Sequence, residues 1–172
     1  FRLGGVNDPL NIPLCEPEDE AIFGGFQSYD DETMWNYETG VKISSGAATF
    51  NTAVFYTKIS DLQVTLDAGS CSSRISFNVP DAHTAGIEFE LSGEPVEGLE
   101  VSFAGALLEA EFDSTVRDGD GGIIGGIEDG NRLASVPEVQ LAAAATFFFP
   151  LDIGGGPSEG FASVSIQHIG NR

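Results

Sequence analysis

Apolar and polar side chains alternate along several long runs of this chain, and this alternation constrains its fold more than any other feature. Ile87, Phe89 and Leu91 stand at every second position, with Glu88 and Glu90 between them. Because successive side chains of a β-strand point to opposite faces, this pattern predicts a strand with one apolar and one polar face. Similar alternation follows positions 99, 141 and 161.

These runs predict an all-β fold, a long antiparallel meander of about six strands that forms part of a transmembrane β-barrel. The expected strands are residues 33–45, 47–67, 75–94, 98–112, 133–151 and 159–170. Strands of soluble domains are usually about five or six residues long, whereas about 9 to 11 residues cross a bilayer at a tilt. The length of the runs therefore favours a barrel that spans a membrane.

The breaks between the runs alternate in length, short near 46, 96 and 155 and longer at 68–74 and 113–132. Short turns on one side and longer loops on the other are typical of membrane barrels. We therefore expect two parts: residues 1–32 as a long extracellular loop, and residues 33–172 as a partial barrel. The long breaks should share one end of the sheet and the short turns the other.

Alternation also predicts which side chains share a face of the sheet. One set should point to lipid or to a partner: Ile87, Phe89, Leu91, Val101, Phe103, Ala143 and Phe147. The other set should point to the lumen of the barrel: Glu88, Glu90, Glu100, Ser102 and Gln140. A register slip of one residue would invert both sets.

The composition excludes two classes of protein. The formal charge is −20, from 27 acidic and seven basic residues, and such a surface would repel a phosphate backbone. We therefore expect no nucleic-acid partner. No apolar stretch approaches the roughly 20 residues of a membrane helix, which excludes a helical membrane protein.

Several strings of the chain, in order, resemble the barrel of TonB-dependent receptors. The first two are DETMWNYETGVK at 31–42 and FNTAVFYTKISDLQV at 50–64. They are followed by NVPDAHTAGIEFEL at 78–91, EGLEVSFAGALLEAEF at 97–112 and GNRLASVPEVQLAAAATFFFPL at 130–151. The resemblance covers residues 31–172, and the loops are individual.

This resemblance implies a segment of a receptor in the outer membrane of a Gram-negative bacterium, whose full barrel has about 22 strands around a plug. It also implies uptake of a scarce ligand of the siderophore, vitamin or carbohydrate class, with energy supplied through the TonB system. The chain lacks a plug and a TonB-contacting box, and it ends in IGNR. We therefore expect an internal segment toward the C-terminal part of the barrel, with outer-membrane lipid and the TonB system as partners and no cofactor.

Trp35 and Tyr37 stand near the start of a predicted strand. Amphipathic aromatic rings are favoured where membrane meets water, so we expect both at that interface, with ordinary packing as the alternative. Ligand-binding residues are not identifiable.

Four carboxylates in a Gly-rich loop are the weak candidates for a metal site: Asp118, Asp120, Glu128 and Asp129. Carboxylate oxygens suit Ca²⁺, but the spacing does not fit an EF-hand loop, because Ile123 stands where that loop has Gly. We therefore favour a solvated loop and predict no metal. No catalytic motif is present, and we expect no enzyme.

Cys15 and Cys71 lie in polar, turn-rich stretches assigned to the same, extracellular end. Two cysteines so far apart in sequence do not suit a zinc ribbon or a CxxC redox pair. A disulfide between two loops in an oxidising compartment is the prediction, and two free thiols are the alternative.

A soluble secreted β-sandwich that binds carbohydrate or calcium remains the alternative fold and function. The polar face of the strands would then be the solvent-exposed face of an ordinary sheet. Solubility separates the two hypotheses, because a monomer in detergent-free buffer would leave the face with Ile87, Phe89 and Phe103 exposed to water.

Overall fold

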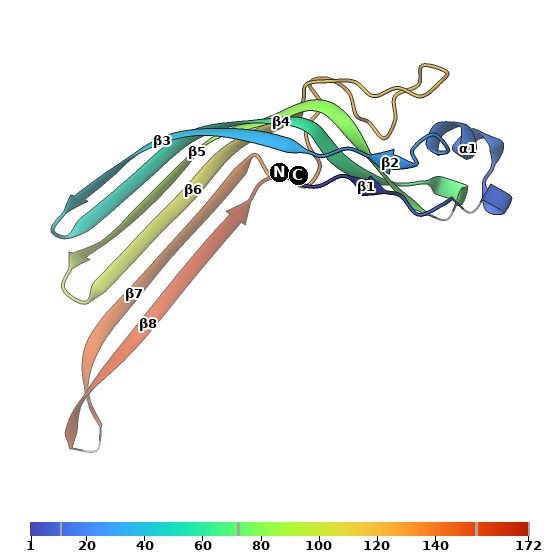
Figure 1. Ribbon diagram of the computed structural model, residues 1–172. Coiled ribbons are helices and arrows are strands. Elements are labelled where there is room, and N and C mark those ends of the chain that lie inside the picture. The colour runs from blue at the N-terminus through green and yellow to red at the C-terminus, as the bar shows by residue number, and fades with distance from the viewer. Residues whose placement is uncertain (11, 72, 154, 172) are drawn as a thin grey trace. The chain divides into compact units, whose positions relative to one another are not determined.

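A computed structural model describes residues 1–10, 12–71, 73–153 and 155–171. Its main feature is a six-stranded antiparallel sheet whose strands follow one another in chain order (Figure 1). The strands are β3 (Thr33–Ser45), β4 (Ala48–Asp67), β5 (Arg74–Val96), β6 (Leu99–Phe112), β7 (Val139–Ile153) and β8 (Gly156–Ile169). The predicted all-β meander is confirmed, and most strand bounds agree within a few residues.

The start of β7 is the largest difference in strand bounds. Alternation predicts a strand from 133, whereas β7 begins at Val139. Ser135 has a φ of 68°, a left-handed conformation that an extended strand does not contain. Pro137 follows and has no N–H to donate to a neighbouring strand. Residues 133–138 are therefore the end of the loop.

The register of β6, β7 and β8 places the apolar and polar side chains on opposite faces, as predicted. Phe103 is opposite Ala143, which is opposite Ile166. Ser102 is opposite Ala144, which is opposite Ser165. Residues directly opposite in neighbouring strands share a face, so the first row is apolar and the second contains small or polar residues.

The apolar face includes β5 as well. The rings of Phe89 and Phe103 have their centroids 5.5 Å apart. Phe89 also covers Gly105, where an added Cβ would lie 2.5 Å from Cζ of the ring. Glycine is therefore required at 105, because any side chain there would displace Phe89.

The chain divides into two compact units. Unit 1 contains residues 1–36, 56–84 and 110–133, and unit 2 contains residues 37–55, 85–109 and 134–172. The connection between β4 and β5 and most of the connection between β6 and β7 belong to unit 1. The short turns at 46–47 and 97–98 fall within unit 2, as do the end of β7 at Ile153 and the start of β8 at Gly156. The predicted alternation of short and long connections is confirmed.

Unit 1 has a hydrophobic core of its own. Ile75, Phe77 and Val79 of β5 are buried there together with Ile124 and Ile127 of the loop after β6. The loop is held over the strands by these two isoleucines, because their burial removes apolar surface from water. A segment that sequence predicts to be irregular is thus tied to the sheet by packing.

The N-terminal 32 residues are more ordered than a long loop. They contain β1 (Gly5–Val6), the 3-10 helix η1 (Ile12–Leu14), α1 (Pro17–Phe23) and β2 (Ser28–Tyr29). Pro17 at the first turn and the acidic residues Glu18, Asp19 and Glu20 favour a helix start. Phe26 stacks on Phe77 with ring centroids 4.7 Å apart.

No helix among the described residues has the length and apolar character needed to cross a membrane.

Candidate functional site

The polar face of unit 2 contains an open hollow of about 460 Å³. Its floor is made of small residues of adjacent strands, Ala53, Ala104, Ala106 and Ala142. Polar side chains from four strands surround this floor: Asn51, Glu88, Glu90, Gln140 and Gln167. The alanines leave space because their side chains are short. The longer polar side chains on the same face of the neighbouring strands stand around that space.

A side-chain hydrogen bond joins β4 and β5 on this face. Asn51 Nδ2 donates to Glu90 Oε2 at 3.2 Å. Asn51 Oδ1 is buried and has no hydrogen-bond partner among the described residues. Because a buried acceptor without a donor is costly, the amide oxygen of Asn51 is suited to receive a hydrogen bond from a group that enters the hollow.

The chemistry of the hollow is that of a recognition surface. Glu88 and Glu90 offer carboxylate oxygens, which accept hydrogen bonds and attract cations. Gln140 and Gln167 offer amides, which both donate and accept. Sequence reasoning predicted that Glu88, Glu90 and Gln140 face the lumen, which stays a prediction, and it did not predict the hollow or the unpaired Asn51 oxygen.

The opposite face of unit 2 leaves large apolar side chains accessible. Phe103 is 40% exposed, Phe147 46% and Ile166 71%. Ile87, Leu91 and Val164 are exposed as well. A contiguous apolar surface of this kind indicates contact with lipid or with a partner.

Trp35 and Tyr37 lie two residues apart on β3 and therefore on the same face of that strand. Both side chains are exposed. Their predicted position at the membrane interface stays a prediction.

The four candidate metal ligands do not form a metal site among the described residues. Asp118 Oδ1 instead accepts backbone N–H groups from Asp120 at 3.0 Å and Gly122 at 2.7 Å. These bonds stabilise a tight turn, a common role for Asp. Asp129 donates its backbone N–H to Thr115 Oγ1 at 3.0 Å. Glu128 contributes its backbone carbonyl, which accepts from Asn131 N at 2.9 Å.

Cys15 and Cys71 are joined by a disulfide that spans 56 residues of sequence. Ser70, which precedes Cys71, forms hydrogen bonds with Glu16 and Asp19. Glu16 N donates to Ser70 Oγ at 2.8 Å, and the Ser70 hydroxyl and backbone N–H both donate to Asp19 Oδ2, at 2.5 and 2.8 Å. The disulfide and these hydrogen bonds together fasten α1 to the connection between β4 and β5.

The two hydrogen bonds from Ser70, the hydroxyl first and the backbone N–H second, lower the pKa of Asp19 below its ordinary value of 3.8. A depressed pKa in the folded state stabilises the fold above the unfolded pKa, and this stabilisation is lost as pH falls through the folded pKa. We therefore expect the contact between α1 and Ser70 to be intact at neutral pH and to weaken below about pH 4.

Hydrogen exchange of residues 16–24 between pH 7 and pH 2 measures this effect, after correction for the intrinsic exchange rate. Asp19→Asn should flatten the pH dependence. Glu18→Gln removes one negative charge from the same turn of α1 and is the matched control. An Asp19→Asn profile as steep as that of the unmodified protein would contradict the assignment.

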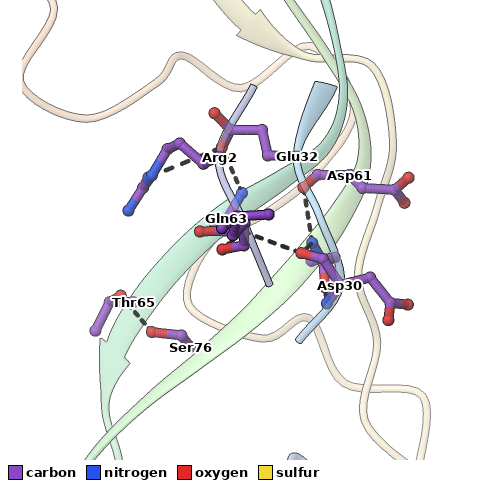
Figure 2. Close-up of polar contacts among 9 residues, drawn as sticks. Arg2, Asp30, Glu32, Asp61, Gln63, Thr65 and Ser76 are labelled. Carbon is purple, nitrogen blue, oxygen red and sulfur yellow. Dashed lines mark hydrogen bonds and ion pairs between the residues drawn. The ribbon is translucent and has the colours of Figure 1, made fainter. Parts of the chain in front are cut away.

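A polar network joins the N-terminal segment to β4 and β5 (Figure 2). Gln63 donates its backbone N–H to Glu32 Oε2 at 2.9 Å and its side-chain amide to the carbonyl of Asp30 at 3.0 Å. Asn78 donates to the carbonyls of Asp30 and Asp61, at 3.0 and 2.7 Å. Asp61 has a φ of 56°, which departs from regular strand geometry. Its backbone carbonyl accepts the hydrogen bond from the side-chain amide of Asn78.

Glu32 is the buried charged residue of this network, with 3% of its surface exposed. Its carboxylate lies 3.9 Å from the guanidinium of Arg2. Sequence reasoning missed Glu32, Gln63 and Asn78, because nothing in their local sequence shows that a segment from the N-terminus will lie across β4 and β5. Asn78 follows the ordinary alternation of its strand, between the apolar Phe77 and Val79, so its polar character gave no separate signal.

Among solved structures, the crystal structure of the ferric yersiniabactin uptake receptor FyuA from Yersinia pestis is similar to this chain, with a TM-score of 0.55 and 20% identity. The match covers 81% of this chain and 19% of FyuA, so the chain spans about a fifth of that receptor. At this identity the likeness establishes the fold. A search of curated proteins finds no match.

The family comparison covers almost the whole chain. A family model described as TonB dependent receptor-like, beta-barrel, matches residues 3–172. This range includes the polar hollow, the apolar face and the disulfide-linked N-terminal segment. The chain therefore belongs to the TonB-dependent receptor β-barrel family.

Proposed function

We propose that this chain forms six consecutive strands of an outer-membrane TonB-dependent receptor, in the C-terminal part of its barrel. The apolar face of unit 2 contacts lipid, and the polar face lines the lumen. The receptor takes up a scarce small molecule of the siderophore, vitamin or carbohydrate class, with energy from the TonB system through a plug. Residues 1–32, 68–73 and 113–138 lie at the extracellular end.

The observation that carries this proposal is the two-faced sheet in a chain of this family. The row of Phe103, Ala143 and Ile166 suits hydrocarbon, whereas the row of Ser102, Ala144 and Ser165 suits a water-filled or plugged lumen. An aqueous lumen also accommodates Glu88 and Glu90, which would be costly on the lipid face. The hollow around Asn51 adds an unpaired acceptor to this inner surface.

The sandwich alternative requires a second sheet over the apolar face. In the part of the chain that the structure describes, the other sheet is the two-stranded pair β1–β2, which belongs to unit 1. The apolar face of unit 2 is accessible instead. This arrangement favours the barrel, and membership of the family supports it.

Chemical labelling of the receptor in intact cells tests the proposal. Asp120 lies in the connection after β6, and Glu97 lies in the turn between β5 and β6. A maleimide coupled to a polymer too large to pass through porins should label Asp120→Cys on intact cells. It should label Glu97→Cys only after the outer membrane is opened, because antiparallel strands place alternate connections on opposite sides.

Both variants should react equally in detergent, which controls for the reactivity of each thiol. Cys15 and Cys71 do not react with maleimide while their disulfide is intact. Labelling of Glu97→Cys on intact cells would contradict the proposed orientation. Recovery of the receptor outside the outer membrane would contradict the proposed function.

A further inference from the structure

The hollow on the polar face of unit 2 offers more hydrogen-bond acceptors than donors. Glu88 and Glu90 line it, and an ionised carboxylate accepts hydrogen bonds but cannot donate them. Asn51 donates through Nδ2 to Glu90, and its buried Oδ1 has no partner among the described residues. Donors come mainly from the amides of Gln140 and Gln167, and each amide adds an acceptor as well. A group that enters the hollow is therefore recognised mainly through its own N–H or O–H donors.

The strand register gathers these groups around one floor. Ala104 lies opposite Ala142, and Ala142 lies opposite Gln167. Ala106, two residues further along β6, lies opposite Gln140. Residues directly opposite in neighbouring strands share a face, so the two amides of β7 and β8 stand on the same face as the alanines. The two carboxylates come from β5, on the other side of β6.

The carboxylates give the hollow a negative charge. Glu88 and Glu90 are two residues apart on β5 and therefore share a face, about 7 Å apart along the strand. A partly enclosed surface lined by one sign of charge attracts ions of the opposite sign. The hollow therefore favours a group that carries positive charge as well as hydrogen-bond donors.

One ammonium group stands beside this acidic region. Lys42 is the one lysine or arginine among the described residues of unit 2. The hydroxyl oxygens of Ser44 and Thr49 are 3.3 Å apart across β3 and β4, and this antiparallel register places Lys42 opposite Asn51. Lys42 is exposed and does not line the hollow. Its single charge leaves two carboxylates with one counter-charge between them.

We propose that the hollow is a subsite for a positively charged N–H donor group, a guanidinium or an ammonium, on the molecule that the receptor takes up. A guanidinium has five N–H donors and no acceptor, and its planar fork bonds both oxygens of a carboxylate. Asn51 Oδ1 supplies a further acceptor. A neutral hydroxyl group would also find acceptors here, but it would leave the excess negative charge uncompensated. This inference rests on the proposed function, and it adds the charge and donor character of the ligand group that meets this wall.

Binding of butylguanidinium to the full receptor in detergent tests the proposal. Butylurea has nearly the same shape and no charge, so it is the matched neutral probe. Saturation-transfer NMR titrations measure both dissociation constants. Butylguanidinium should bind about tenfold more tightly than butylurea, because hydrogen bonds between charged groups are stronger than those of neutral groups.

Variants of the receptor test whether this preference arises in the hollow. Glu90→Gln should weaken the binding of butylguanidinium by about tenfold and leave that of butylurea nearly unchanged, and Asn51→Ala should also weaken it. Glu88→Gln is the second charge variant, because Glu88 is outside the contact between Asn51 and Glu90. Glu100→Gln is the matched control: it removes the same charge on β6, opposite Thr146 and outside the hollow. Circular dichroism checks that each variant keeps its sheet.

Three results would overturn the subsite. They are equal losses in Glu90→Gln and Glu100→Gln, equal binding of the two probes, and no binding of butylguanidinium, as when a side chain of the plug already fills the hollow. None of these results bears on the outer-membrane function, which cell fractionation decides. Recovery of the receptor outside the outer membrane, with the preference for butylguanidinium retained, would refute that function and keep the cation site.

Discussion

Replacing Phe103 with arginine is expected to destabilise the membrane-inserted receptor by about 2 to 4 kcal/mol if the residue lies near the bilayer midplane. Phe103 is in the middle of β6, 40% exposed on the apolar face, and its ring lies against Phe89. Arginine at this site would place a charge in hydrocarbon and would remove the ring contact. A denaturant titration of the receptor folding into lipid vesicles measures the loss.

Ser102→Arg is the matched control, because the neighbouring residue on the same strand faces the opposite side of the sheet. Ser102 lies opposite Ala144 on the polar face and is exposed. A charge there would enter the lumen, so the loss of stability should be much smaller than at Phe103. Equal losses in the two variants would show that the faces do not separate lipid from lumen.

Removal of the disulfide is the second large effect that we expect. Cys15 and Cys71 close a loop with a sequence separation of 56. In the chain-entropy model, a crosslink over such a loop stabilises the folded state by about 4 kcal/mol, because it restricts the unfolded chain. In the double variant Cys15→Ala, Cys71→Ala, α1 and the connection between β4 and β5 should therefore unfold at a lower denaturant concentration.

Hydrogen exchange of residues 12–24 and 68–79 in the receptor measures this opening. The unmodified receptor treated with a reductant is the control, and it should resemble the double variant, because both lack the crosslink. Mass spectrometry of the unreduced, digested receptor is the independent measurement. Two separate peptides with alkylatable thiols would contradict the bridge and weaken the placement of both connections at one end.

The acidic surface is consistent with a ligand that is not strongly anionic. The chain carries 27 acidic and seven basic residues, and Glu88 and Glu90 line the hollow on the polar face. Like charges repel at short range in a partly enclosed lumen.

The amino-acid sequence alone determined the strands, their two faces and the alternation of short and long connections. These properties are local, because each residue of an extended strand points to the side opposite its neighbour. Phe103 and Ser102 therefore had predictable faces before any register was known. The bounds of β3, from Thr33 to Ser45, were predicted without error for the same reason.

The tertiary structure alone decided how the segments outside the strands are held. The order in the first 32 residues, the burial of Glu32 and the hollow around Asn51 were not predictable from local pattern. Each depends on residues far apart in sequence, such as Glu32 with Gln63 or Phe26 with Phe77. Buried polar groups need hydrogen-bond partners, and buried apolar side chains need packing partners. Local sequence does not name these partners, because they come from segments that only the fold brings together.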